Sequence, residues 1–307
     1  MSKIVKALEM AKEARLSRSL QRQKAAEEAA VAAATAARAG APTAPVEART
    51  KAPPQRKEPV PVKDSLGPRT GHDIVRRKSS RAVIKTMDEV EPLSRVELAD
   101  KKIIYPEMEN QRVLNVFRDL RTTLLTIADG SNFSCLVTSV VPKGGSSFVA
   151  TNLATAFSFD DSKTSLIIDC NLNAPNPNLP ISQVKVGLTE YLEDDELKAG
   201  DIIRPTGIPR MRAVSSGGRR EIPAEYFSSD RMIEFLEEVQ GKFRDRYTFL
   251  DGPSTKESAD VKLLSSLCDY ILLVVPYARV TTSQVEATVR TIDQSKLIGV
   301  VFNNEPY

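Results

Sequence analysis

The sequence has no tryptophan, and histidine occurs only once among its 307 residues. His72 lies in polar sequence, which leaves little basis for a histidine acid–base centre or a histidine-ligated metal. Cysteine is also rare: Cys135, Cys170 and Cys268 stand singly inside apolar runs, without a CxxC spacing. This pattern indicates neither a disulfide framework nor a zinc site, so we expect three core thiols. Metalloenzyme and Ser-His-Asp classes lose most of their support.

Long apolar runs are missing as well. No stretch reaches the roughly 18 to 20 apolar residues that a membrane-spanning helix needs. The opening residues MSKIVKALEMAKEARLSR are charged throughout and contain no apolar segment typical of a signal peptide. The sequence therefore predicts a cytoplasmic protein.

Charge divides the chain into two unlike parts. Residues 1–90 carry 19 Lys and Arg against 10 Asp and Glu, whereas the remainder carries 24 against 30. Residues 1–39 lack proline and end in an alanine-rich stretch, which predicts a helical arm. This arm is either a solvated helix or a docking helix whose Ile4 and Leu8 face meets a partner or an anionic membrane surface. Residues 40–89 predict a disordered, basic linker rich in proline and alanine.

The body, residues 90–307, predicts a doubly wound α/β fold with a mostly parallel sheet of P-loop NTPase type. Short, almost continuously apolar runs are typical of strands that are buried on both faces. They occupy residues 135–141, 165–169, 247–251, 270–276 and 298–303. Between them, helical spacing covers 148–159, 230–245, 257–267 and 281–296. Ligands of such sheets bind at the carboxyl ends of the strands, so function is expected there.

A glycine pair follows the first strand and leads directly into a helix. Backbone N–H groups in such a turn, together with the helix N-terminus, favour phosphate oxygens. The expected lysine of a phosphate loop is replaced by Ser146, and Lys143 is the only cation nearby. A plain strand-to-helix turn is the alternative. The predicted nucleotide-binding residues of this turn are Pro142, Lys143, Gly144, Gly145, Ser146 and Ser147.

Two further strands end in aspartate, at Asp169 and Asp251. Unpaired carboxylates at buried strand tips are costly, and Mg²⁺ beside a phosphate is a usual compensation. We therefore expect Ser147, Asp169 and Asp251 to hold the metal, and the two acids to be the catalytic candidates, although helix capping is an alternative for either one.

Taken in order, these motifs resemble the P-loop tyrosine kinases of bacterial capsule and exopolysaccharide systems, which are relatives of the MinD/ParA ATPases. The resemblance covers about 105–304. It rests on FRDLRTTL, the loop followed by TNLATAF, LIIDCNLNAPN, GLTEYLEDD, VSSGGRREIPAEYFSSDRM, TFLDGPS, DYILLVVPYARVTTSQV and LIGVVFNN. It implies ATP or ADP with Mg²⁺ as cofactors, and it puts Asn303 where relatives read the adenine edge.

The sequence departs from this family at the residues that carry its chemistry. The family's loop lysine is Ser146 here, and its second acid and following arginine are Asn171 and Asn173. The loss of a single well-placed cation costs about 10³ to 10⁵ in phosphoryl-transfer rate. Catalysis is therefore expected to be lost or much weakened, with weak nucleotide binding retained. Lys143 is the candidate substitute cation if the protein is instead active.

Two other family features are incomplete. The helix used for ring assembly keeps Arg118 and Arg121 but has Asn115 in place of a glutamate, so the two arginines are the predicted oligomer interface. The family's C-terminal cluster of tyrosines is reduced to Tyr307. The missing cluster adds to the expectation of impaired catalysis.

The resemblance implies a regulator of exopolysaccharide or capsule biosynthesis or export, peripheral at the inner membrane through a membrane polysaccharide co-polymerase, the chain-length regulator. An active kinase relative and further copies of this chain are additional expected partners. The alternatives are an active tyrosine autokinase that uses ATP and a MinD/ParA-like positioning ATPase. Residues 1–90 lack a base-reading surface, so no specific nucleic-acid partner is expected.

Overall fold

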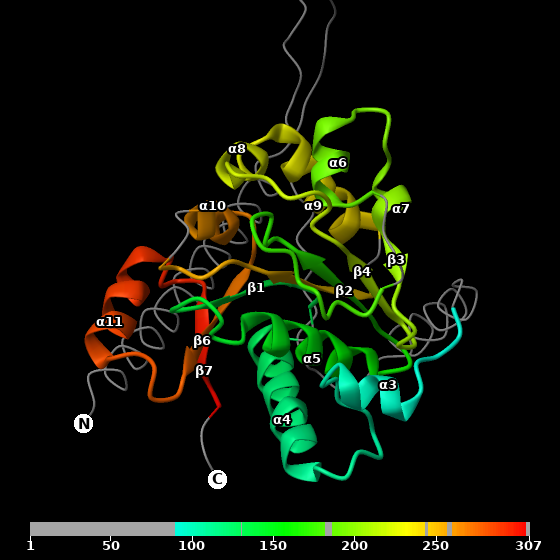
Figure 1. Ribbon diagram of the computed structural model, residues 1–307, viewed down its shortest axis with the longest axis vertical. Helices are drawn as coiled ribbons and strands as arrows, with labels where there is room; N and C mark the ends of the chain where they lie inside the picture. The colour runs from blue at the N-terminus through cyan, green and yellow to red at the C-terminus, as the bar shows by residue number, and fades with distance from the viewer. Residues whose placement is uncertain (1–89, 130, 182–185, 243–244, 257–259, 305–307) are drawn as a thin grey trace, which may run out of the picture. The chain divides into compact units, whose positions relative to one another are not determined.

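The computed structural model describes residues 90–304 except for 130, 182–185, 243–244 and 257–259 (Figure 1). The predicted helical arm and linker, residues 1–89, lie outside the described residues. The helices are α3 (Arg95–Asp100), α4 (Gln111–Ile127), α5 (Ser146–Ser158), α6 (Leu188–Glu193), α7 (Ala199–Ile202), α8 (Pro223–Phe227), α9 (Asp230–Lys242), α10 (Asp260–Ser266) and α11 (Thr282–Thr291). The strands are β1 (Ser134–Ser139), β2 (Thr164–Asp169), β3 (Arg204–Pro205), β4 (Met211–Val214), β5 (Arg246–Asp251), β6 (Tyr270–Pro276) and β7 (Leu297–Asn303).

The strands form one sheet of seven in the order β3-β4-β2-β5-β1-β6-β7. Every neighbouring pair is parallel except β3 with β4. All residues of β1, β2, β4 and β5 are buried, as expected for parallel strands that are covered on both faces. The predicted doubly wound, mostly parallel α/β fold is confirmed.

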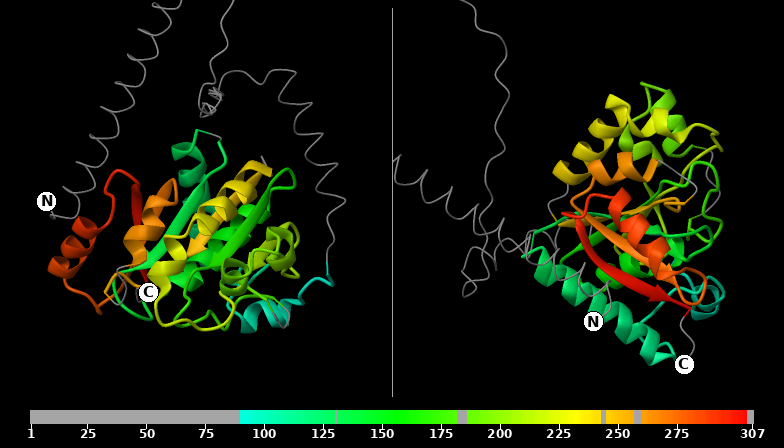
Figure 2. Two further views of the ribbon diagram at one scale, coloured as in Figure 1. Left: turned by 90° about the horizontal axis from the view of Figure 1, so that it is seen from above. Right: turned by 90° about the vertical axis from the view of Figure 1, so that its left-hand side faces the viewer.

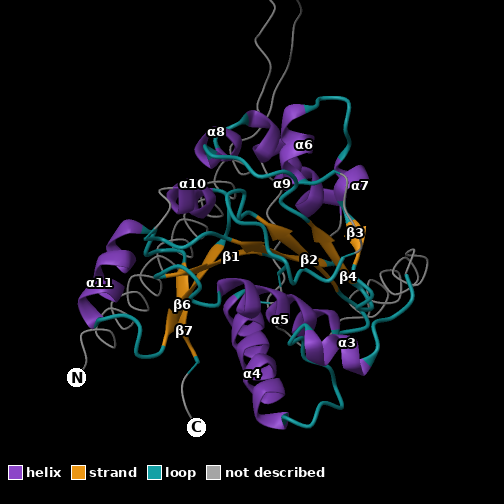
Figure 3. Cartoon of the chain, in the orientation of Figure 1, coloured by secondary structure: helices purple, strands orange, loops and turns teal. Residues whose placement is uncertain are grey.

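Helices cover both faces of this sheet (Figures 1 and 3). One face carries α5, with α4 packed outside it, and α3 lies beside them. The other face carries α9 and α10, with α6, α7 and α8 nearby, as the turned views also show (Figure 2). Because α5 consists mainly of small residues, its backbone lies close to the sheet and nearly all of its residues are buried. Its N-terminus meets the carboxyl ends of β1 and β5.

An aromatic cluster fills the core under α5. The Phe133 ring lies 5.7 Å from that of Phe157 in an edge-to-face arrangement, and Phe157 lies 4.6 Å from Tyr247. Such pairs add about 0.5 to 1.5 kcal/mol each beyond their buried area. All three cysteines are free and buried, as predicted. Burial raises the pKa of the Cys268 thiol to about 12, so this cysteine stays a neutral, unreactive thiol.

The helix expected over 281–296 is shorter than predicted, because α11 ends at Thr291. The next residues form a turn in which the Asp293 carboxylate accepts hydrogen bonds from the backbone N–H and hydroxyl of Ser295, at 2.9 and 2.6 Å. Aspartate and serine compete with helical hydrogen bonding in this way. The turn leads directly into β7 and so fixes where that strand enters the sheet.

Candidate nucleotide site

The predicted phosphate loop is a tight turn between β1 and α5. The Gly144 N–H donates to the Val141 carbonyl at 3.1 Å, and the Ser139 hydroxyl donates to the same oxygen at 2.9 Å. Gly145, the residue before α5, has a φ of 95° and no side chain caps the helix. The first N–H groups of α5 are therefore left for an anion, which the positive end of the helix dipole also favours.

Asn303, at the end of β7, closes the loop from outside. Its side-chain amide donates to the Gly144 carbonyl at 3.0 Å. A Cβ on Gly145 would stand 1.9 Å from the Asn303 amide nitrogen, so only glycine fits between the loop and this side chain. The residue expected at the adenine edge is thus placed directly against the loop.

The charge of the loop depends on two of its residues, Ser146 and Lys143. Ser146 is buried, and its hydroxyl is 3.4 Å from the Gly252 carbonyl, which makes at most a weak hydrogen bond. Lys143 is exposed in a left-handed conformation with φ 54°. Ser146 is uncharged and Lys143 is exposed, so the loop itself holds no buried cation.

Asp169 and Asp251 lie side by side, at paired positions of β2 and β5. They are 1% and 0% exposed. Burial raises the pKa of Asp251 well above its ordinary value, and the neighbouring Asp169 charge adds to this increase. Burial also raises the pKa of Asp169, although backbone hydrogen bonds from Asn176 and Asn171 oppose it. Two adjacent buried acids of this kind need either a shared proton or a cation.

Asparagines surround the acid pair. The Asn176 N–H donates to Asp169 Oδ2 at 2.7 Å, and its side-chain amide donates to Asp251 Oδ2 at 3.3 Å. Asn171 donates its backbone N–H to Asp169 Oδ1 at 3.0 Å and its side-chain amide to the Asp251 carbonyl at 3.2 Å. An aspartate at position 171 has no N–H to make this last bond. Asn173 is exposed.

The donors present fit a magnesium ion. Asp251 Oδ1 is buried and has no hydrogen-bond partner among the described residues, which leaves one carboxylate oxygen for a metal. Ser147, Asp169 and Asp251 are the oxygen ligands available, and phosphate and water oxygens would complete the preferred shell of Mg²⁺. Within the described part of the chain, no three His, Cys, Asp or Glu residues gather to hold a metal by themselves, so these two acids and one hydroxyl would need the phosphate and water oxygens as well. The ion would neutralise phosphate charge.

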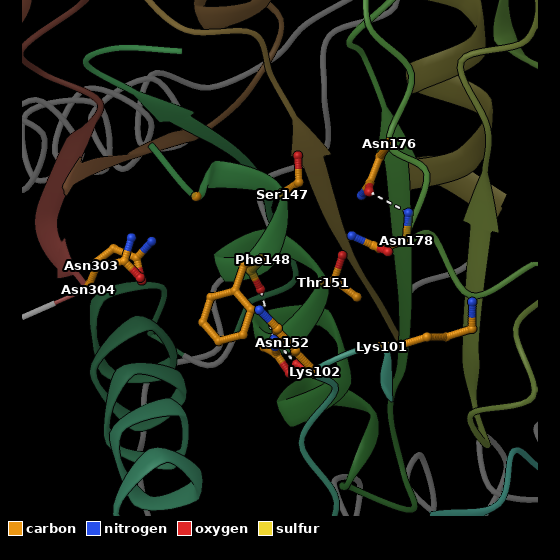
Figure 4. A pocket seen from close by; sticks show the side chains of 11 residues that line it. Lys101, Lys102, Ser147, Phe148, Thr151, Asn152, Asn176, Asn178, Asn303 and Asn304 are labelled. Atoms are coloured by element: carbon orange, nitrogen blue, oxygen red, sulfur yellow. Dashed lines mark hydrogen bonds between the residues drawn. The ribbon is translucent and has the colours of Figure 1, made fainter. Parts of the chain in front are cut away.

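A cleft of about 330 Å³ runs along the exposed side of the α5 N-terminus (Figure 4). Asn303 and Asn304 line one side, and Asn176 and Asn178 line the other, with Phe148 between them. The remaining lining residues are Lys101, Lys102, Gly145, Ser147, Thr151 and Asn152. The cleft therefore joins the predicted adenine end, the loop and the neighbourhood of the acid pair.

Known proteins share this sequence pattern and this fold. The chain is 26% identical to the tyrosine-protein kinase ptk of Acinetobacter johnsonii over 219 residues, which are 69% of this chain and 29% of that enzyme. It is 26% identical to the tyrosine-protein kinase CpsD of Streptococcus agalactiae over 214 residues, 69% of this chain and 90% of that one. The chain is thus similar in sequence to bacterial tyrosine kinases.

Solved structures agree with this kinship at the level of the fold. The kinase domain of the Escherichia coli tyrosine kinase ETK superposes with a TM-score of 0.57 at 21% identity, covering 71% of this chain and 91% of that one. The chimerical protein CapA2B2 gives a TM-score of 0.60 at 22% identity, covering 75% and 100%. No protein-family model matches the chain.

None of the described helices is both long and apolar enough to cross a membrane.

The tyrosine-kinase resemblance predicts an assembly role for α4, and the structure shows where its arginines lie. Arg118 and Asn115 are exposed. Arg121 is instead turned onto its own fold: it donates to the Ala156 carbonyl at 3.2 Å and lies 3.7 Å from the Asp160 carboxylate. Arg121 thus fastens α4 to the end of α5, and the role of both arginines in oligomer formation stays a prediction.

Arg279, which the sequence alone did not single out, braces the phosphate loop. Its guanidinium donates to the Lys143 carbonyl at 2.6 Å and to the Pro142 carbonyl at 3.0 Å. A planar group with two parallel donors suits this pair of carbonyls, and a lysine ammonium lacks this fixed two-pronged geometry. The signal in the sequence was its place in PYARV, just after a strand end.

Replacing Arg279 should therefore loosen the loop. We expect Arg279→Ala to weaken binding of a fluorescent ADP analogue about fivefold, since about 1 kcal/mol of hydrogen bonding is lost. Arg279→Lys should recover part of this loss. Arg290→Ala removes another exposed arginine, whose carboxylate neighbour is 4.0 Å away, and should leave the affinity unchanged. Equal affinities for the alanine variant at 279 and the original protein would show that the brace is dispensable.

Proposed function

We propose that this protein binds MgADP or MgATP between the phosphate loop and the acid pair and acts by binding, with little or no phosphoryl transfer. One observation carries this proposal. The loop and the buried acids are intact, whereas Ser146 and Asn171 occupy the positions of the lysine and the second acid and face carbonyls of residues 252 and 251.

Magnitudes favour retained binding over retained catalysis. Phosphoryl transfer depends almost wholly on placed charge, so one missing cation costs about 10³ to 10⁵ in rate. Binding loses less, because a charged hydrogen bond contributes about 1.5 to 3 kcal/mol, or about tenfold to a hundredfold in affinity. Backbone amides, Ser147 and the two acids remain to hold the ligand. The protein therefore serves as a nucleotide-dependent binding partner.

The pathway we propose is exopolysaccharide or capsule biosynthesis or export. Sequence similarity to the tyrosine-protein kinase CpsD supports it. In this proposal the body docks from the cytoplasm on a membrane polysaccharide co-polymerase. The segment 1–39, which the segment 40–89 joins to the body, engages a partner. Arg118 and Arg121 are the proposed contacts for joining rings of an active relative or of further copies.

Two measurements test the proposed chemistry together. Purified protein incubated with MgATP should show no phosphotyrosine, under conditions in which the S. agalactiae kinase becomes labelled. A fluorescent ADP analogue should bind, and more tightly with Mg²⁺ than with a chelator. Robust labelling would overturn the binding-only function, and absence of nucleotide binding would overturn the nucleotide site.

Docking on the membrane partner calls for a separate experiment. The full chain and a chain lacking residues 1–89 should be compared for capture by the cytoplasmic segments of a co-polymerase. We expect capture of both, with the shorter chain retained through the body. Loss of capture with the shorter chain would assign the contact to the segment 1–89 instead.

A further inference from the structure

The positive charge of the cleft comes from outside the phosphate loop. Lys101 and Lys102 are the only Lys, Arg or His among the described residues that line the cleft. They follow α3, about forty residues before the loop in the sequence. The sequence resemblance rests on other motifs and assigns these two lysines no role. Because position 146 is serine, the loop lacks a cation that would offset phosphate charge, and the two lysines are candidates to supply it.

Asn152 fixes this pair against α5. Its side-chain amide donates to the Lys102 carbonyl and to the Phe148 carbonyl, both at 3.0 Å, and its carbonyl accepts from the Ile104 N–H at 2.8 Å. Asn152 is only 1% exposed, so these bonds are shielded from water. The lysine backbone is thus held at a defined level of the helix, while the lysine side chains remain outside the core.

The lysine side chains lie within reach of the loop. Asn152, which bonds to the Lys102 carbonyl, is five residues after Ser147, about 7.5 Å along a helix that rises about 1.5 Å per residue. Figure 4 shows Lys102 beside Asn152 and Lys101 extending on the side of Asn178. A lysine stem has four carbons and ends in a mobile ammonium, so both can approach a phosphate at the α5 N-terminus.

The local structure leaves both ammonium groups available. Within the described residues no salt bridge joins either lysine. Glu97, one turn before Lys101 on α3, directs its carboxylate to the Ser94 backbone N–H and hydroxyl, at 2.8 and 2.7 Å, and its interaction with the Lys101 charge is only electrostatic. Lys102 also keeps a φ of 56°, a conformation in which non-glycine residues are uncommon and which is often found at binding sites.

We propose that Lys101 and Lys102 supply the cationic contact to the nucleotide's phosphates that the loop lacks at Ser146. This proposal rests on the proposed nucleotide binding and deepens it. Because the pair stands about one helical turn from the loop, it stabilises the bound phosphate chain from the α5 side. It does not occupy the position of the family's loop lysine, so it supports binding and leaves phosphoryl transfer impaired.

The test compares full-length variants by titration with a fluorescent ADP analogue. The double variant Lys101→Gln with Lys102→Gly removes both charges, keeps polar bulk at 101 and accepts the left-handed backbone at 102. We expect about tenfold weaker binding and a shallower dependence of affinity on salt concentration. Replacing both residues by arginine should preserve binding, and Lys198→Ala, at an exposed lysine far along the chain, should change nothing.

The outcomes separate the two proposals. If the original protein binds the analogue and the double variant binds equally well with the same salt dependence, the lysine pair has no role and the nucleotide site stands. If the original protein binds no nucleotide, both proposals fail. Thermal unfolding of the double variant confirms that the affinity is measured on folded protein.

Discussion

Ser146→Lys is expected to tighten MgADP binding about tenfold to a hundredfold, while phosphotyrosine remains undetectable. The substitution places a cation at the first residue of α5, where a charged hydrogen bond to phosphate contributes about 1.5 to 3 kcal/mol. Without ligand the same charge opposes the positive end of the helix dipole and costs about 0.3 to 1 kcal/mol of stability. Affinity and stability should therefore move in opposite directions.

Catalysis should not return with this single change. Asn171 still takes the place of the family's second acid, and its amide is bonded to the Asp251 carbonyl. Ser228→Lys adds the same charge at an exposed serine and should alter neither affinity nor labelling. If Ser146→Lys leaves the ADP affinity unchanged, the turn at 142–147 is not the phosphate site. If it creates strong labelling, the second acid is not needed.

Asp251→Asn is expected to raise the stability of the free protein at neutral pH and to abolish the effect of Mg²⁺ on nucleotide binding. Burial, aided by the Asp169 charge, raises the pKa of the Asp251 carboxyl in the folded state. The folded chain therefore holds this proton more strongly than the unfolded chain. The stability that this bound proton gives the folded state is fully present below about pH 4 and is lost as the pH rises through the folded-state pKa.

At neutral pH the variant should thus gain about 1 to 3 kcal/mol, or several °C in Tm, by removing a carboxyl group whose ionisation the buried site opposes. The advantage should shrink toward pH 4, where the original carboxyl is protonated. Asp119→Asn, at an exposed aspartate of α4, should show neither effect. A variant at 251 that is less stable at pH 7, or that keeps its Mg²⁺ dependence, would contradict the assignment of Asp251 as a buried metal ligand.

Most of the sheet was predictable because its strands are continuous apolar runs. The five predicted strands all form. Two of them, which end at Asp169 and Asp251, are neighbours in the sheet, and this places the acids together. The strand Met211–Val214 escaped prediction because it is short and Arg212 interrupts its apolar sequence. That arginine is buried, so its position depends on tertiary surroundings that no local pattern reveals.

The site was predictable only where local sequence determines it. A glycine pair before a helix and aspartates at strand ends are local signals, and the structure puts both at one edge of the sheet. Asn176 was missed, although it bridges both acids, because its two bonds depend on how the loop after β2 folds back. Lys101 and Arg279 were missed for the same reason: each reaches the cleft or loop from a distant segment.

The contacts that close the phosphate loop span most of the body. Arg279 and Asn303 bond to loop carbonyls from 136 and 159 residues further along the chain. During synthesis at about 5 to 20 residues per second, the loop therefore emerges from the ribosome roughly 10 to 30 s before its last partner. In a growing chain the loop therefore stays without these two contacts until β7 has formed, so the braced loop marks a body whose final strand is already in place.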